Sequence, residues 1–235
     1  MANLVFPALS QIYADSQTSF KSGCATALCE MANIVGSDFT NTKIVPILMD
    51  LSKDDNAEVR LNVINKMKNV YDVVQADLLT PVFLKQLDTL SKDSQWRVRM
   101  ATIELVGDIS VCVSKDTYFA KLHDIFIQFM TNSAAAVRDM GIQKVPLLMQ
   151  KFGYQFAKEY LMKEAEKVYN QEKCPFHFRI SCLRTIGAIW VGRDKEGNRF
   201  QTQALNGDET QTLVKQCMPL WQKAFRDNVA NVKFV

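Results

Sequence analysis

The segment DDNAEVR at residues 54–60 recurs as DSQWRVR at residues 93–99, and these two stretches decide the fold. Each copy begins with an aspartate and ends with a valine followed by an arginine. Weaker copies of the same seven-residue pattern stand at residues 15–21, 132–138, 173–179 and 227–233. Because a fixed period of about 20 to 50 residues is typical of repeat proteins, the chain is predicted to be a stack of similar units.

The basic residue that closes each copy gives the length of the units. Successive bases are 39, 39, 39, 41 and 54 residues apart, at Lys21, Arg60, Arg99, Arg138, Arg179 and Lys233. Apolar residues recur at helical spacing on both sides of the motif, so each unit is predicted to be two helices joined by a turn. We therefore expect an all-α, right-handed α-α superhelix with about five full helix pairs and a partial one.

The spacing also divides the chain. We expect one solenoid domain over residues 1–235, with an insertion where the last interval lengthens. The polar stretch at residues 193–208 is interpreted as that insertion, a surface loop. The predicted units are roughly 1–38, 39–76, 77–115, 116–152, 153–192 and an incomplete 209–235.

Two columns of the motif predict packing and charge pairing. The residue before the base is always apolar and is expected to face the core, at Phe20, Val59, Val98, Val137, Phe178 and Val232. The first motif position is aspartate in four copies and Asn132 in a fifth, and it is expected to cap the second helix, with Lys173 as the exception. A cation near a helix start opposes the helix dipole, so we expect the bases to pair with aspartates of neighbouring units. The predicted ladder comprises Asp15, Asp54, Arg60, Asp93, Arg99, Arg138, Arg179 and Asp227.

A third column predicts the functional surface. The position three before the base holds small residues except at Trp96 and Phe176. A close-packed site that fits alanine could not take tryptophan without strain, so both aromatics are expected on the exposed ridge of turns. An exposed tryptophan beside Arg97 has the composition of an interface hot spot. The alternative, in which Trp96 folds back onto its own repeat, stays open here.

A proline stands 14 residues before the base in several copies, at Pro7, Pro46 and Pro219. Since a proline inside a helix costs about 3 kcal/mol, its recurrence predicts a kinked first helix. Proline in the first helix, aspartate in the turn and Val-Arg in the second helix resemble the HEAT repeat, over essentially the whole chain.

The stretches KDDNAEVRLNVINKM, SKDSQWRVRMATIELV, KFGYQFAKEYL and DNVANVKF are similar to the C-terminal repeats of the scaffold (A) subunit of protein phosphatase 2A. That resemblance implies a part of a longer scaffold that holds the phosphatase catalytic subunit on its ridge of turns. A regulatory (B-type) subunit would bind mainly through repeats outside this sequence. The resemblance also implies a cytoplasmic protein that could enter the nucleus, and a catalytic-subunit-binding set of Trp96, Arg97, Phe176, His177, Val229 and Asn231.

Composition excludes several other classes. The net charge is +3 and the bases are spread along the chain, so no nucleic acid partner is expected, and no run approaches the roughly 18 apolar residues of a membrane span. Six cysteines without a C-x-x-C pair and only two histidines indicate reduced core thiols and no metal or cofactor. No nucleophile and base stand in a known catalytic motif, so the chain is expected not to be an enzyme. The alternative function is a nuclear transport receptor or other carrier solenoid, which the slightly basic charge disfavours.

Overall fold

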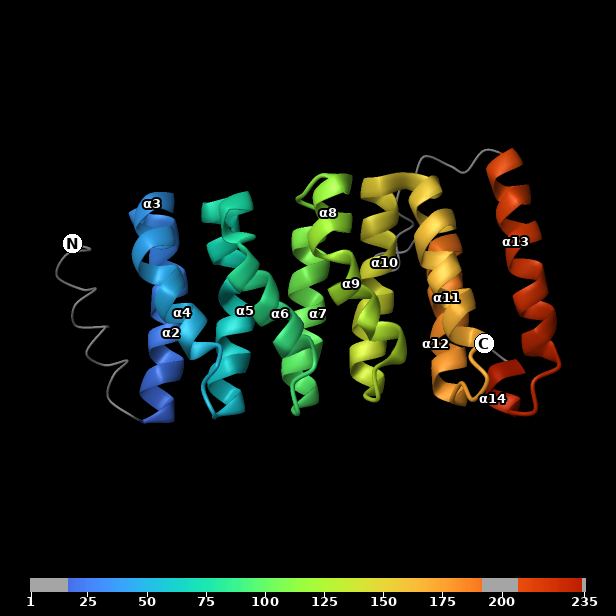
Figure 1. The fold of residues 1–235 in the computed structure, drawn as a ribbon, viewed down its shortest axis with the longest axis horizontal. Coiled ribbons are helices and arrows are strands. Elements are labelled where there is room, and N and C mark those ends of the chain that lie inside the picture. The colour runs from blue at the N-terminus through green and yellow to red at the C-terminus, as the bar shows by residue number, and fades with distance from the viewer. Residues whose placement is uncertain (1–16, 192–206, 234–235) are drawn as a thin grey trace. The chain divides into compact units, whose positions relative to one another are not determined.

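The computed structural model describes residues 17–191 and 207–233, and in these residues all regular structure is helical (Figure 1). Helices alternate with short turns along the sequence, and second helices recur at the period of the motif. The chain is an all-α repeat solenoid, as the sequence predicts. It divides into two compact units, which meet in the sequence between Ile125 and Phe126 and are described separately as unit 1 and unit 2.

Unit 1 is built around second helices that lie side by side, with α5 packed between α2 and α7 (Figure 1). Shorter helical segments form the first helices of the repeats and connect them. The second helices are α2 (Thr18–Val35), α5 (Ala57–Val74) and α7 (Trp96–Ser110). The connecting segments are α3 (Ser37–Phe39), η1 (Thr40–Ile44), α4 (Val45–Leu51), η2 (Gln75–Leu78), α6 (Pro81–Ser91), α8 (Lys115–Lys121) and α9 (His123–Phe126).

Unit 2 repeats the scheme, with α12 packed against both α10 and α11. Helix α10 runs on toward the next first helix, but Gly153, with φ +78°, breaks the helical path there. A positive φ at this point suits glycine, which has no Cβ to clash with the backbone. The segments are η3 (Ile127–Thr131), α10 (Ala135–Phe156), η4 (Ala157–Leu161), α11 (Met162–Tyr169), α12 (Phe176–Val191), α13 (Gly207–Phe225) and α14 (Ala230–Lys233).

The aspartate of the motif does not cap the second helix, which corrects the sequence-based prediction. The side chain of Asp54 accepts a hydrogen bond from the backbone N–H of Asn56 at 2.9 Å. Asn56 is the N-cap of α5, and its own side chain accepts from Glu58 N–H at 2.8 Å. The aspartate lies two residues before the cap because the turn needs those residues to redirect the chain, so it orders the turn that leads into the helix.

Some of the first helices are interrupted, whereas α6 and α13 are each a single helix. In unit 1 the π-helical segment η1 precedes α4, and Pro46 occupies the first turn of α4, where its missing N–H costs nothing. In unit 2 Pro219 lies inside α13, while η4 is a π-helical segment without proline. Pro7 lies outside the described residues. Interrupted first helices therefore occur in both units, but Pro219 does not interrupt its helix, since α13 runs through it.

The apolar column before the base faces the core in most repeats. Val59, Val98, Val137 and Val232 are buried. Phe20 and Phe178 depart from the prediction. Phe20 is 53% exposed, and the first helix assigned to its repeat falls outside the described residues. The ring of Phe178 is half-buried because it turns toward His177 and the guanidinium of Arg138.

The cysteines are free thiols, and those on second helices and α13 belong to the core. Burial raises the pKa of Cys29 and Cys182 to about 12, so these thiols stay protonated and unreactive at neutral pH. Cys112 is exposed, unlike the others. None of the described helices combines the length and the hydropathy needed to cross a membrane.

Candidate binding ridge

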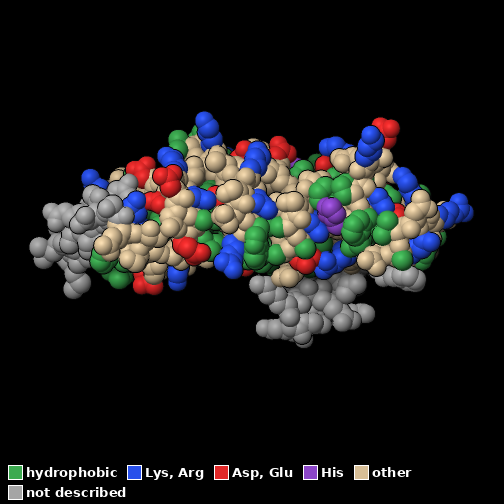
Figure 2. All heavy atoms as spheres, turned by 90° about the horizontal axis from the view of Figure 1, so that it is seen from below, with side chains coloured by type: hydrophobic (Ala, Val, Ile, Leu, Met, Phe, Trp, Pro, Cys, Tyr) green, Lys and Arg blue, Asp and Glu red, His purple; other side chains and the backbone are tan. Residues whose placement is uncertain are grey.

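The turns between first and second helices carry the predicted site. We call residues 54–58 and 93–97 the turn ridge of unit 1, and residues 132–136, 173–177 and 227–231 the turn ridge of unit 2. Each described second helix begins three residues before the base of its motif, at Thr18, Ala57, Trp96, Ala135, Phe176 and Ala230. Figure 2 shows the molecule from below, with Lys and Arg side chains scattered among hydrophobic ones on the visible surface.

Ion pairs link successive repeats of unit 1 at the turn ridge. Lys21 Nζ lies 2.6 Å from Asp54 Oδ2. Arg60 makes a two-point contact with Asp93, with Nε 2.7 Å from Oδ2 and Nη2 2.9 Å from Oδ1. Burial alone would raise the pKa of Asp93, but the hydrogen bonds from Arg60 and Gln95 N–H and the charge of Arg60 together lower it. The carboxylate is thus held in its ionised form by the repeat before it.

Each arginine also clasps the turn of its own repeat, which the sequence-based analysis missed. Arg60 Nη1 donates to the carbonyls of Asp54 and Asp55 at 2.7 and 2.9 Å. Arg99 Nη1 donates in the same way to Asp93 and Ser94 at 2.7 and 3.1 Å. The constant six-residue spacing between motif aspartate and motif base was the signal that could have revealed this clasp. Carbonyl contacts offset the unfavourable position of a cation at a helix start.

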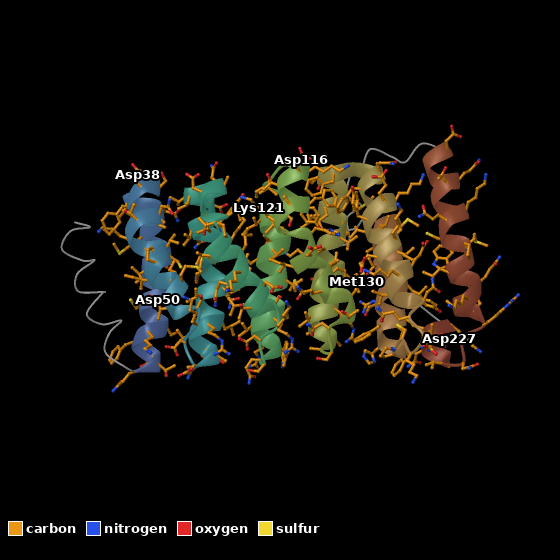
Figure 3. All side chains as sticks on the ribbon, viewed as in Figure 1. Asp38, Asp50, Asp116, Lys121, Met130 and Asp227 are labelled. Atoms are coloured by element: carbon orange, nitrogen blue, oxygen red, sulfur yellow. The ribbon has the colours of Figure 1, made fainter. Side chains whose placement is uncertain are left out.

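Unit 2 contains the same pairing between α12 and the turn before α14. Arg179 Nε lies 2.8 Å from Asp227 Oδ2, and Nη2 donates to Oδ1 at 2.9 Å. Asp227, labelled in Figure 3, lies in the turn that joins α13 to α14. Burial opposes its ionisation, but Val229 N–H and Arg179 outweigh that effect and lower the pKa of Asp227. Asp15, the first member of the predicted ladder, lies outside the described residues.

Arg138 has a different set of partners. Its Nη1 clasps its own turn through the carbonyls of Asn132 and Ser133 at 2.8 and 2.9 Å. Its Nε donates to Ser181 Oγ at 2.9 Å, where Arg60 and Arg179 meet an aspartate. The sequence explains the change, because Lys173 stands at the position where the next motif would supply the carboxylate.

On unit 1, Trp96 lies at the edge of a shallow groove between consecutive turns. Its side chain is 41% exposed, as expected, and the Arg97 guanidinium lies 5.5 Å from its ring centroid. The tryptophan therefore does not fold into the core of its own repeat. The groove has a volume of about 230 Å³ and is lined by Ala57, Glu58, Leu61, Gln95, Trp96, Arg97 and Val98.

On unit 2, Phe176 is 44% exposed at the start of α12. Its ring meets the ring of His177 edge to face at a centroid distance of 5.4 Å. Burial, and then the charge of Arg138, lower the pKa of His177, which keeps the imidazole neutral at physiological pH. Val229 is half-buried and Asn231 is exposed, so the other predicted contact residues of this unit also lie on or beside its turn ridge.

The ridge provides contacts rather than reactive groups. Its features are exposed aromatic rings, cations stacked on them, and ordered turns. No group of three or more histidine, cysteine or acidic side chains that could hold a metal occurs in the described parts of the chain. Such an arrangement is suited to binding another protein.

Comparison with known proteins supports the fold. No protein-family profile matches the chain, and no curated protein matches it in sequence. Among solved structures, the chain is similar to the designed armadillo repeat protein YIII(Dq)4CqI, with a TM-score of 0.50 and 12% identity over 97% of this chain and 95% of that one. An engineered protein is similar with a TM-score of 0.48 and 12% identity, over 97% and 92% of the two chains. The first likeness is one of fold alone, and it makes the chain an α-helical repeat solenoid.

Proposed function

We propose that this chain is a non-catalytic scaffold that binds the catalytic subunit of a serine/threonine phosphatase through its turn ridge. In that role it would help to assemble the catalytic subunit with a regulatory subunit. The solenoid fold supports a protein-binding role, and the sequence resemblance to the phosphatase 2A scaffold supplies the identity of the partner. A cytoplasmic location, with entry into the nucleus, follows from the same proposal.

The observation that carries the proposal is the exposed Trp96 on the rim of its groove. Tryptophan and arginine are the residues in which protein interfaces concentrate their binding energy. The Arg97 guanidinium over the indole ring restricts both side chains before a partner arrives, which lowers the entropy lost on binding. Burial of the exposed ring under a partner would then add favourable apolar contact.

Substitution of Trp96 tests the proposal. We expect Trp96→Ala to raise the Kd for the purified phosphatase catalytic subunit by about 30-fold, which corresponds to about 2 kcal/mol. The fold should lose little stability, because the side chain contributes to the surface. Binding is measured by surface plasmon resonance and stability by thermal unfolding.

Ile34→Ala is a matched control for this experiment. Ile34 is an apolar side chain in the last turn of α2 and is 82% exposed, so its removal changes exposed hydrophobic area away from the turn ridge. Equal affinities for the two variants would contradict the assignment of the ridge. Recovery of a small GTPase or nucleoporin repeats as main partners from lysate would instead support a carrier solenoid.

A further inference from the structure

Arg138 differs from Arg60 and Arg179 in what it lacks. Arg60 donates from Nε and Nη2 to the two oxygens of Asp93, and Arg179 donates from Nη2 to Asp227, with its Nε 2.8 Å from the second oxygen but not in hydrogen-bonding geometry. At Arg138 the corresponding carboxylate is replaced by the lysine at position 173. The fold thus contains two arginines that show where an anion sits, and among the residues that the structure describes no acid takes that position at Arg138.

The hydrogen-bond donors of Arg138 show where an anion could bind. A guanidinium has five N–H donors. Nε meets Ser181, and Nη1 meets the carbonyls of Asn132 and Ser133. Within the described residues Nη2 donates no hydrogen bond, although the side chain is only 8% exposed. Because Nη2 is not itself fully buried, it can be reached from the surface.

The charge of Arg138 is compensated only in part by its neighbours, because burial lowers the pKa of this arginine, Asp139 opposes that effect and Arg184 adds to it. Asp139 is the nearby acid, but it forms an ion pair with Arg184. The face of the Phe178 ring lies 6.0 Å from the guanidinium and provides only a cation–π contact. The N-terminal turn of α12 contains no acidic residue and adds the positive end of a helix dipole. A charge this buried is costly unless an opposite charge meets it.

We infer that Arg138 receives a carboxylate from the partner protein, an aspartate or glutamate side chain that takes the position Asp93 holds toward Arg60. This inference rests on the proposed function in that the carboxylate belongs to a bound protein. The rings of Phe178 and His177 lie near the Arg138 guanidinium, and Phe176 contacts His177, so the recognised segment presents an apolar side chain next to its acid.

One partly compensated charge fits one carboxylate. A phosphate group at neutral pH carries more negative charge and is usually held by several bases. The other nearby guanidinium, Arg184, is occupied by Asp139. Lys173 lines a polar hollow whose other charged residues are Glu172, Arg179, Lys223, Arg226 and Asp227, and Arg138 does not line it. The site is therefore matched to a monoanion.

The chemistry of the site can be tested without the partner. Sodium acetate serves as the probe, with sodium chloride and inorganic phosphate as comparisons at constant ionic strength, and the full chain is followed by NMR. Bound acetate should shift the Arg138 Nε–H signal and raise the pKa of His177, because a negative charge offsets the guanidinium that lowers it. His123, the other histidine of the chain, is the internal control and should not respond.

Substitution of Lys173 supplies the missing carboxylate from within the chain. Lys173→Asp, or the longer Lys173→Glu, should weaken acetate binding at Arg138 by at least about 10-fold, since the site is then occupied. Lys173→Ala removes the lysine without adding an acid and should keep binding at the level of the unmodified chain. These variants leave Arg138 and its hydrogen bonds to Asn132, Ser133 and Ser181 in place.

Several results would overturn the inference. Acetate could move the Arg138 and His177 signals no more than chloride does, phosphate could bind more tightly than acetate, or the acidic and alanine variants could behave alike. Capture of the catalytic subunit separates the two proposals. If Trp96→Ala abolishes capture but Lys173→Asp leaves it unchanged, the carboxylate inference fails and the scaffold stands. If acetate binds but the catalytic subunit is not captured, the scaffold assignment fails and the anion site stands.

Discussion

Arg60 of unit 1 and Arg138 of unit 2 hold the same motif position but use their guanidinium groups differently at the turn ridges. In unit 1, Arg60 clasps its own turn with Nη1 and binds Asp93 of the next repeat with Nε and Nη2. In unit 2, Arg138 keeps the clasp but loses the carboxylate. The turns form in both cases. The clasp therefore shapes the turn within a repeat, while the carboxylate pair is a separable link between repeats.

The separation has an energetic basis. Backbone carbonyls at a helix entrance are present whatever the sequence, so the clasp needs only the arginine. The link needs an aspartate at one position of the next motif, and a single substitution removes it. Where the link is absent, the guanidinium keeps donor capacity that a partner can use.

Removal of a carboxylate from the regular junction should have the largest effect. We expect Asp93→Ala to lower the free energy of unfolding by about 3 kcal/mol, because it leaves Arg60 without its counter-charge and Gln95 N–H without its acceptor. Urea denaturation measures the loss. Asp50→Ala, which removes an exposed pairing with Lys53, is the control and should cost less than about 0.5 kcal/mol. Similar losses in the two variants would show that the ladder contributes nothing special.

Substitution of Arg60 or Arg138 by methionine should have the next largest effect and should distinguish the two junctions by their loss of stability. Arg60→Met leaves the largely buried Asp93 carboxylate without a counter-charge and should lower the free energy of unfolding by about 2 kcal/mol. Arg138→Met strands no acid and keeps similar volume, so its cost should stay below about 1 kcal/mol. Both values come from urea denaturation of the same chain. A larger loss at Arg138 would mean that the clasp, rather than the ion pair, dominates the stability of these junctions.

Acid should weaken the regular junction specifically. The pKa of Asp93 is lowered in the folded state, so its ionised form contributes stability that is fully present above its unfolded pKa of about 3.9 and is lost as pH falls through the lower folded pKa. Asp93→Asn lacks this contribution. The stability difference between the two chains should therefore narrow between about pH 5 and pH 2. A difference that stays constant over this range in urea denaturation would contradict the assigned coupling.

Restoration of the link in unit 2 should give the smallest effect. Lys173→Asp is expected to stabilise the chain by about 0.5 to 1 kcal/mol relative to Lys173→Ala, because a partly exposed pair with Arg138 replaces a lone buried cation. Thermal unfolding of the two variants measures the gain. A loss of stability would indicate that the turn at residues 173–177 cannot bring the new carboxylate to Arg138.

The sequence predicted the repeat and its helices well, because both depend on local patterns. The all-α fold and the exposure of Trp96 and Phe176 followed from the motif spacing and from one column of side-chain sizes. The predicted burial of Phe20 was wrong because the prediction assumes that every repeat has the same neighbour. The predicted burial of Phe178 was wrong because its aromatic ring reaches a neighbouring cation.

The hydrogen-bond partners of individual side chains were harder to predict than the helices. The assignment of Asp54 as a helix cap failed because a turn of two further residues separates it from the helix, and residue type alone cannot distinguish a turn acceptor from a cap. Ser181 as the acceptor for Arg138 could not be found either, since it lies in a different helix and outside the motif. The Trp96 groove likewise needs Leu61 and Glu58 from the preceding repeat.

The clasp that each arginine makes on its own turn has a consequence for how such chains grow. Arg60 and Arg99 order their turns through carbonyls of the same 39-residue block, so each block contains the residues that order its own turn. Duplication or loss of a whole block would leave every remaining turn intact and would require only that the new neighbours supply an acid to the exposed guanidinium. Gene-level changes in solenoid length can then proceed in modules, with the acid column as the one place where newly joined modules must be matched.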